Sequence, residues 1–410
     1  MSIRPLLFAL FVGCVQFIEA QVHDQLSCGS DLRDAYFKNS DADYKERRAE
    51  IEAYYAKNET SQKASGIIQI PVVVHVIYRL PEQNISETQI SSQINVINKD
   101  YSASNWDTAM IPKIWKPLIA DFEMEFVLAN RDPDGNPHSG ITRTMTTTVD
   151  FGVLNGDNHC LASAGGHEIW DRNRYLNVWV CEIAGSYYGF ATYPGAPSYC
   201  DGIVIDWESF GTNGTASTPT NKGRTLTHEI GHWFDIPHLW GNTSCGDDGI
   251  SDTPIQEGGN FGCESYPHVT CNNGPHGDMF MNFMDWSDDD CLLFFTKGQK
   301  SRAHTALSSQ RNSLFNSDGY NGINTISNSP GLNIYPNPAI DQITVNFEEE
   351  IEVLSISILS SGGQTLKTIG VNNRCLSQRM DTHNLPPGLY LLKINAQSAI
   401  YIDKFMVARP

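Results

Sequence analysis

Four residues near the middle of the chain, His228, Glu229, His232 and His238, restrict its local fold more than any other part of the sequence. Histidines at positions i and i+4 of a helix project from one face about one turn apart, so His228 and His232 can reach one metal ion. His238 can join them only if the helix ends and the chain turns back. Three protein ligands leave one position of a zinc ion open, which is typical of a catalytic zinc, and Glu229 can reach a water in that position.

A surface helix with unrelated histidines is the alternative interpretation. The pair His228 and His232 alone could arise by chance in a chain of 410 residues, but a third histidine at this spacing strengthens the metal interpretation. We therefore expect an active-site helix that begins near residues 220–225, runs through Trp233 and ends about Asp235.

The N-terminus has the composition of a secretory signal peptide. Arg4 precedes an apolar run from Leu6 to Ile18 that is too short to span a bilayer, and Ala20 supplies the small residue at which such signals are cut. No later segment reaches transmembrane length. We therefore expect residues 1–20 to be removed and the remainder to be exported as a soluble monomer.

The number of cysteines and the net charge restrict the compartment and the partners of this protein. Of ten cysteines, Cys14 falls in the signal peptide, so nine enter an oxidising compartment, and an odd number predicts at least one free or specially used thiol. The formal net charge of −19 disfavours nucleic acid and anionic membranes as partners. We attribute this acidity mainly to solubility, with calcium sites as a further contribution.

Residues 21–65 are polar and form a candidate propeptide, with helical character between Asp41 and Lys57. Cys28 stands in this segment beside a glycine. Its thiolate can occupy the open zinc position and keep a precursor inactive until the segment is removed. An equally good alternative is that Cys28 pairs with another cysteine or has no special role.

Residues 66–314 mix strand and helix patterns. The run Ile67–Tyr78 is β-branched and apolar, as in a buried strand, and isoleucines recur at helical spacing in residues 86–101. Further strands are predicted at 122–128, 175–183 and 202–207, and a helix at 296–314. This mixture predicts an α/β domain with a twisted mixed sheet. His75, inside the first strand, is expected to be a core residue and not a ligand.

The stretch from Gly241 to Asp278 is irregular and needs cross-links. It contains Cys245, Cys263 and Cys271, with Cys291 following, and four cysteines allow three pairings. It also contains clustered hard oxygen ligands suited to calcium, for which ordinary Asx-turns are the alternative explanation; these are Asp247, Asp248, Asp252 and Thr253.

The C-terminal part has a different composition. Asn, Ser, Gly and Pro dominate residues 315–331, which indicates a linker. Residues 332–410 then alternate apolar and polar positions, as in 343–347 and 389–394, and predict a small all-β sandwich.

The run His228–Gly241, the segment Cys245–Pro254 and the turn Asn282–Trp286 together resemble the pappalysin family of metzincin zinc peptidases. The resemblance covers residues 67–314. It implies a metzincin-like catalytic domain with zinc on the three histidines, Glu229 as general base and acid, and Met284 as the Met-turn methionine beneath the metal. It further implies two disulfides and a calcium site, which would be Cys245–Cys271, Cys263–Cys291 and calcium near Asp248, Asp252 and Thr253.

Three positions need comment within this resemblance. Metzincins usually carry glycine where this chain has Asp235, but aspartate tolerates left-handed backbone angles, so we expect the turn to form. Where Trp286 stands, the family places a tyrosine whose hydroxyl can stabilise the tetrahedral intermediate; an indole N–H is a donor of different reach. Asp289 matches an acid on the S1′ wall of relatives, which would favour Arg or Lys after the cut bond, although a solvated acid explains it nearly as well.

A second resemblance covers the C-terminal domain. The segments Asn333–Pro338, Leu385–Tyr390 and Lys404–Val407 are similar to the sorting domain of type IX secretion substrates. This implies contact with an outer-membrane secretion machinery and a secreted or cell-surface location. A carbohydrate-binding or spacer sandwich is the alternative.

The predicted function is that of a secreted zinc endopeptidase whose protein or peptide substrate lies extended beside an edge strand near Phe190–Tyr193. Lys57 and Lys63 lie where activation cleavage would release the propeptide. The rival functions are an inactive binding protein or adhesin with the same fold, and a metal-dependent esterase.

Overall fold

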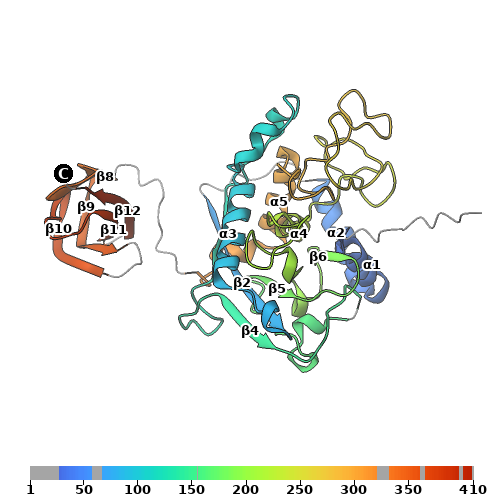
Figure 1. The fold of residues 1–410 in the computed structure, drawn as a ribbon, viewed down its shortest axis with the longest axis horizontal. Coiled ribbons are helices and arrows are strands. Elements are labelled where there is room, and N and C mark those ends of the chain that lie inside the picture. Colours follow the sequence, from blue (N-terminus) through green and yellow to red (C-terminus); the bar gives the residue numbers. More distant parts are fainter. Residues whose placement is uncertain are drawn as a thin grey trace, which may run out of the picture.

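The computed structural model describes residues 27–57, 67–154, 156–320, 332–360, 365–396 and 400–408. The expected signal peptide, Lys63 and most of the expected linker lie outside these residues. Figure 1 shows two bodies, each built on a sheet of its own. No helix of the described ranges has the length and apolarity that a bilayer crossing requires.

The helices are α1 (Ser30–Ser40), α2 (Ala42–Tyr55), α3 (Glu87–Tyr101), α4 (Arg224–Trp233) and α5 (Lys297–Ser309). The strands of the first body are β1 (Ser27–Cys28), β2 (Ile68–Tyr78), β3 (Met124–Leu128), β4 (Ile141–Met145), β5 (Leu176–Cys181), β6 (Tyr187–Ala191) and β7 (Ile203–Asp206). Those of the second are β8 (Leu332–Tyr335), β9 (Gln342–Ser360), β10 (Thr365–Asp381), β11 (Gly388–Ala396) and β12 (Ile400–Val407). The helices and strands expected in residues 66–314 form within a few residues of their expected bounds, and β6 overlaps the edge strand expected near Phe190–Tyr193. Strands β1 and β4 and helix α1 were not expected.

The sheet of the first body is mixed, which confirms the expected α/β class. Its order is β1-β6-β7-β5-β2-β3, and β4 also pairs with β2. Strands β2, β3, β4, β5 and β7 run parallel, whereas β6 runs antiparallel to β7. Strand β1 adds to β6 in parallel. Strand β6 would therefore be the edge of this sheet if the N-terminal residues were absent.

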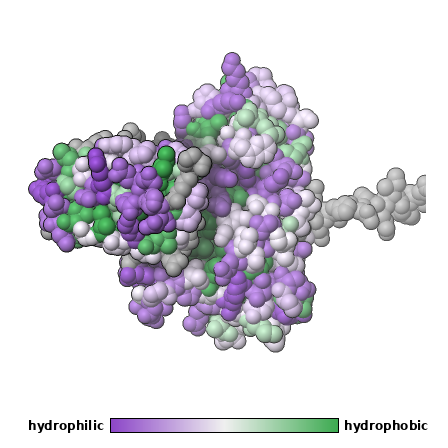
Figure 2. Space-filling model, turned by 60° about the vertical axis from the view of Figure 1, so that its left-hand side comes forward, coloured by the Kyte–Doolittle hydropathy of each residue, from purple (hydrophilic) through white to green (hydrophobic). Residues whose placement is uncertain are grey.

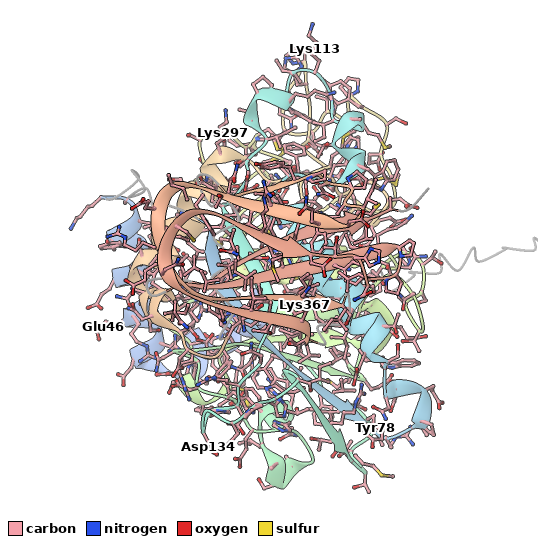
Figure 3. The ribbon with its side chains drawn as sticks, turned by 90° about the vertical axis from the view of Figure 1, so that its left-hand side faces the viewer. Glu46, Tyr78, Lys113, Asp134, Lys297 and Lys367 are labelled. Carbon is pink, nitrogen blue, oxygen red and sulfur yellow. A yellow bond between two sulfur atoms is a disulfide. The ribbon has the colours of Figure 1, made fainter. Side chains whose placement is uncertain are left out.

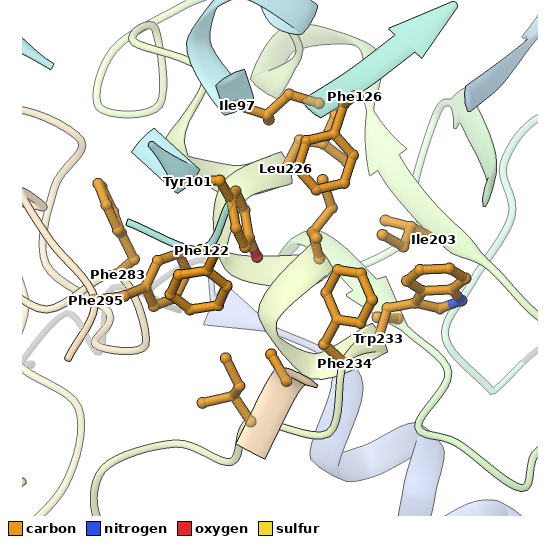
Figure 4. Packing of buried hydrophobic residues seen from close by; sticks show 14 of the residues in the cluster. Ile97, Tyr101, Phe122, Phe126, Ile203, Leu226, Trp233, Phe234, Phe283 and Phe295 are labelled. Atoms are coloured by element: carbon orange, nitrogen blue, oxygen red, sulfur yellow. The ribbon is translucent and has the colours of Figure 1, made fainter. Parts of the chain in front are cut away.

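Helix α4 is buried at every position, and an aromatic core surrounds it (Figure 4). The ring of Tyr101 on α3 lies 5.0 Å from those of Phe122 and Phe126, and its hydroxyl donates to the carbonyl of Thr227 on α4 at 3.1 Å. Leu226 and Trp233 face the same cluster. Close packing on all sides holds α4 in one position, which a metal site built on this helix requires.

Residues 27–57, called the N-terminal segment below, pack their few apolar side chains against the first body. Phe37 and Tyr44 cluster with Ala196, while Ile51 and Tyr55 cluster with Ala306. Helices α1 and α2 lie together along one flank in Figure 1. The outer face of α2 is polar, and Glu46 points away from the molecule in Figure 3.

Three disulfides are present in the described residues. Two of them close the loop region after α4 with the pairing that the family resemblance implied, Cys245–Cys271 and Cys263–Cys291. The third, Cys160–Cys200, could not be assigned from sequence. Cys28, Cys181 and Cys375 are free thiols.

The C-terminal body is all β, as expected. Every strand pair in its sheet is antiparallel, and the long strands β9 and β10 pair along most of their length. Ile356, Ile358, Leu392 and Phe405 lie at the centre of its hydrophobic core. On the face drawn in Figure 2, hydrophobic residues also appear on the outside of this body. Among the exposed hydrophobic residues of its strands, Leu389 pairs across strands with Met406, and both are about half exposed.

Candidate active site

The structure brings the three predicted zinc ligands together. His228 and His232 project from α4, and His238 returns from the turn that follows. Their Nε2 atoms lie 3.0 Å apart between His228 and His232, 3.0 Å between His232 and His238, and 3.2 Å between His228 and His238. Ligands about 2.0–2.1 Å from a tetrahedral zinc ion would lie at nearly this separation.

The other ring nitrogens explain why three imidazoles can face one another. His228 Nδ1 lies 2.7 Å from the carbonyl of Phe283, His232 Nδ1 lies 2.8 Å from that of Ile236, and His238 Nδ1 lies 2.8 Å from Asp31 Oδ2. Each Nδ1 therefore carries the proton, and each Nε2 directs a lone pair at the other two. Burial lowers the pKa of His228 to about 3 and that of His232 well below its usual value. Three converging lone pairs fit a bound cation such as zinc.

The turn after α4 has the hydrogen bonds of a Schellman motif. The amide of Asp235 donates to the carbonyl of His232 at 2.8 Å, and that of Ile236 donates to the carbonyl of Gly231 at 2.9 Å. Asp235 adopts the left-handed conformation, with φ of 70°. The aspartate thus takes the backbone angles for which metzincins usually use glycine. Trp240 then stacks on His238 with ring centroids 4.6 Å apart.

Met284, the predicted Met-turn methionine, packs against Gly231 between His228 and His232 of α4. It is fully buried, and its sulfur packs on Gly231 so closely that a Cβ at that glycine would lie 2.4 Å from the sulfur atom. The glycine between the two histidines of α4 is therefore required by this contact. The same turn supplies the carbonyl of Phe283 that orients His228.

Glu229 is buried beside the histidines, and burial raises the pKa of its carboxyl to about 7. Its Oε2 accepts a hydrogen bond of 2.7 Å from Ser30 Oγ of the N-terminal segment. Ser30 Oγ in turn accepts from the amide of Ala191 on β6 at 2.8 Å. Sequence reasoning missed Ser30, because a serine at the start of a polar helix carries no signal of its own.

Cys28 belongs to the same cluster. Its sulfur and a nitrogen from each of the three histidines all lie within 4.8 Å of one another. Pairing of β1 with β6 carries it there, with Cys28 in register with Gly189. The alternative that Cys28 forms a disulfide is excluded in this structure, because its thiol is free.

A cavity of about 390 Å³ opens beside His228 and Glu229 and is lined by Tyr188, Phe261 and Asp289, among others. Asp289 is only 3 % exposed, so it is not the solvated acid of the alternative interpretation. Its Oδ2 accepts from the amides of Lys222 at 2.8 Å and Arg224 at 3.1 Å, at the beginning of α4. Burial raises its pKa to about 6.

Trp286 also lines this cavity. Its indole N–H donates to His238 Nε2 at 3.0 Å. The indole is packed between Trp240 and Phe261, with ring centroids 5.0 Å and 5.8 Å away. The indole therefore places a hydrogen-bond donor beside the three converging histidine nitrogens.

The three residues expected at a calcium ion are engaged in hydrogen bonds within the protein. Asp252 accepts from Thr296 Oγ1 at 2.7 Å and from the amide of Gly298 at 2.8 Å, which ties the loop to α5. Thr253 Oγ1 donates to Asp248 Oδ1 at 2.8 Å. These contacts account for the residues without a cation, and calcium binding stays a prediction.

His75 is a core residue, as expected. It is fully buried, and its ring nitrogens lie 2.8 Å from Thr142 Oγ1 and 3.0 Å from Asn177 Oδ1. Tyr193 is a residue that sequence reasoning missed at the site. Its hydroxyl lies 2.9 Å from His232 Nδ1, next to the carboxylate of Asp31.

Comparison with protein families gives two matches. Residues 163–308 match the family described as pregnancy-associated plasma protein-A, and residues 333–408 match the secretion system C-terminal sorting domain. The chain is 28 % identical over 279 residues to an extracellular metalloprotease of Podospora anserina, which covers 65 % of this chain and 83 % of that protein. An extracellular metalloprotease of Colletotrichum graminicola is 34 % identical over 149 residues, and this chain spans only about half (52 %) of its length.

Solved structures give longer matches. A mutant of promirolysin from Tannerella forsythia is 40 % identical with a TM-score of 0.65, covering 70 % of this chain and 96 % of that one. Mature mirolysin from the same organism, in complex with a cleaved peptide, is 44 % identical with a TM-score of 0.59, covering 61 % of this chain and 96 % of that one. The matched sorting domain and the extracellular relatives indicate a secreted or cell-surface protein.

Proposed function

Because this chain belongs to the pappalysin family of zinc metallopeptidases, we propose that it is a secreted endopeptidase with Glu229 as its general base. The observation that carries this proposal is the convergence of the three Nε2 atoms at 3.0–3.2 Å, with Glu229 beside them at the wall of the cavity. A binding protein or adhesin would have no use for a buried glutamate at this position.

The residues of the site divide the chemistry among them. Zinc, when held by His228, His232 and His238, supplies Lewis acidity toward a water and a peptide carbonyl. Glu229 takes the proton of the attacking water and passes it to the leaving amine.

Strand β6 is the surface that we assign to the substrate main chain. In this structure β1 covers it, and the amide of Gly29 donates to the carbonyl of Gly189 at 2.9 Å. An extended peptide can make the same kind of backbone bond once β1 has left, without selecting side chains. Selectivity then depends on the cavity beside His228. The structure of mature mirolysin, a relative, holds a cleaved peptide, which supports a peptide as the substrate class of this chain.

We further propose that Asp289 favours Arg or Lys after the cleaved bond. Asp289→Asn should lower the preference for Arg over Ala at P1′ by about 10- to 100-fold, since a hydrogen bond to a charged group contributes ~1.5–3 kcal/mol. Asparagine keeps an oxygen for the amides of Lys222 and Arg224, whereas alanine would also remove this helix cap. Profiling a peptide library measures the change. Asp290→Asn, at an exposed neighbour, is the control, and an unchanged preference in Asp289→Asn would remove the proposal.

The N-terminal segment suits a propeptide that holds the enzyme latent. Cys28 lies where a fourth metal ligand would stand, Ser30 binds the proposed base, and β1 covers the substrate edge. Lys57 is exposed and follows α2, so cleavage near it would free the segment. The C-terminal sorting domain would in the same way be the part that contacts the secretion machinery.

One experiment tests both activity and latency. The full chain should leave a fluorogenic peptide uncut, cut it after limited proteolysis upstream of β2, and lose this activity when a chelator removes zinc. Cys28→Ser should cut the peptide before proteolysis, at a rate below that of the processed chain, because Ser30 and β1 still block the site. Chelator-resistant cleavage would exclude a metallopeptidase, and hydrolysis of acylated sugars alone would favour an esterase.

A further inference from the structure

The N-terminal segment also contacts the turn between α4 and His238. This contact lies away from β6, the strand that we assign to the substrate. Arg48 of α2 is 7 % exposed, and its Nη1 lies 2.6 Å from Oδ1 of the fully buried Asp235. The same nitrogen donates to the carbonyl of Pro194 at 3.3 Å, and the guanidinium lies over the ring of Tyr193. This contact involves none of the residues assigned to catalysis.

Asp235 has a second basic partner, which belongs to residues 67–320 of the first body, called the catalytic body below. Arg302 of α5 donates to Asp235 Oδ2 at 2.9 Å and also to the Asp235 carbonyl. Glu52 of α2 links the two arginines, with contacts of 3.0 Å to Arg48 and 2.8 Å to Arg302. The buried carboxylate is therefore balanced by two cations while the N-terminal segment is in place, and by one after it leaves.

Asp31 of the N-terminal segment contacts His238, at the other end of the same turn. Its Oδ2 accepts from His238 Nδ1 at 2.8 Å, and its Oδ1 accepts from the hydroxyl of Tyr193 at 3.3 Å. A carboxylate on the second nitrogen of a metal-binding histidine fixes the tautomer and the orientation of the ring. Asp31, a residue of the N-terminal segment, therefore helps to orient the ring of His238.

The contacts of Arg48 and Asp31 stabilise a turn whose conformation is unfavourable on its own. A left-handed aspartate is less favourable than the glycine that metzincins usually carry, and a buried carboxylate is unfavourable unless it is paired. Arg302 alone leaves one oxygen of the Asp235 carboxylate without a cation, and Arg48 supplies the second cation at that oxygen. Without the turn, His238 cannot reach the other two histidines.

We propose that the N-terminal segment assembles the metal site, with Arg48 and Asp31 holding residues 235–238 in the conformation that completes the three-histidine cluster. This role in metal acquisition is distinct from latency, and it rests on the proposed function only in taking zinc as the ligand of the histidines. The segment is then needed when the chain first folds, whereas Arg302 and bound zinc hold the turn once the segment has gone.

The test uses the full chain carrying Glu229→Gln, so that no variant processes itself. Each protein is unfolded, refolded with zinc, and assayed for zinc per chain and for the rate at which a chelator removes it. Asp31→Asn should release zinc about 10- to 100-fold faster, the range for loss of an outer partner of a metal ligand, because Asp31 bonds His238 Nδ1. Arg48→Gln, which acts through Asp235, should speed release in the same direction and by no more than that range. Arg47→Gln is the matched control, because Arg47 is a half-exposed neighbour on α2 that bonds Asp41 and the carbonyl of Gly195.

The decisive comparison is between Arg48→Gln alone and Arg48→Gln combined with Asp235→Gly. Glycine takes the left-handed angles freely and carries no carboxylate, so Arg48→Gln should have little further effect on zinc release in that background. Equal zinc retention by Arg48→Gln and Arg47→Gln would overturn the inference, and so would an undiminished effect of Arg48→Gln beside Asp235→Gly. If Arg48→Gln fails to refold alone, refolding restored by Asp235→Gly supports the proposal, and failure in both backgrounds overturns it. Absence of zinc from the refolded parent chain would instead overturn the proposed function.

Discussion

Glu229→Gln is expected to lower kcat/KM of the processed enzyme by about 10²–10⁴-fold, the contribution of a positioned general acid or base. Glutamine has nearly the shape of glutamate but cannot take the proton of the attacking water. Its side-chain amide can still occupy the buried position beside Cys28 and Ser30, so the fold should survive. Hydrolysis of a fluorogenic peptide after limited proteolysis measures the loss.

Two measurements keep this result specific. Zinc content and unfolding temperature should match those of the parent chain, because Glu229 is not among the three histidine ligands. Glu208→Gln, a change at an exposed glutamate, is the matched control and should keep full activity. Parent-like cleavage by Glu229→Gln with zinc bound would exclude Glu229 as the base.

The sequence predicted those parts of the fold whose side chains repeat with a clear period. Strand β2 is rich in β-branched residues because it is buried on both faces, and helix α3 places isoleucines at helical spacing with Ser86 as its N-cap. The histidine cluster was equally predictable, because the spacing of His228 and His232 works only on a helix and that of His238 only after a turn.

The missed elements lack such a period. Strand β4 has no fully buried residue, so it shows no alternation of buried and exposed positions. Helix α1 is mostly polar and buries Arg33, whose guanidinium lies 4.4 Å from the ring of Phe37 and whose Nη1 donates to the carbonyl of Val153. An arginine buried through contacts with distant residues cannot be recognised from its own segment.

The partners of Asp235 at the active site could not be predicted from the local sequence either. Its tolerance of the left-handed conformation followed from residue type, but its two arginine partners lie 187 positions upstream and 67 positions downstream in the chain. From backbone preferences alone, the aspartate is a less favourable replacement for glycine. The structure instead gives the carboxylate a partner in each of two separate segments, which only tertiary contacts reveal.

Trp286→Phe is expected to lower kcat by about 10²–10³-fold with a smaller change in KM, as when one oxyanion donor is removed. Phenylalanine retains much of the packing between Trp240 and Phe261 and loses only the N–H that lies 3.0 Å from His238 Nε2. Trp286→Tyr supplies a hydroxyl in the same region and should recover part of kcat.

The comparison of the two variants separates donation from packing. If the ring only fills space, Trp286→Phe and Trp286→Tyr should behave alike, and both should resemble Trp106→Phe, a change at a tryptophan that is 80 % exposed and outside the active-site cavity. If the indole donates to the developing oxyanion, kcat should follow the presence of a donor at position 286, while zinc content stays constant. Steady-state kinetics on one peptide, with kcat and KM resolved for each variant, distinguishes these outcomes, and an unchanged kcat in Trp286→Phe excludes the donor role.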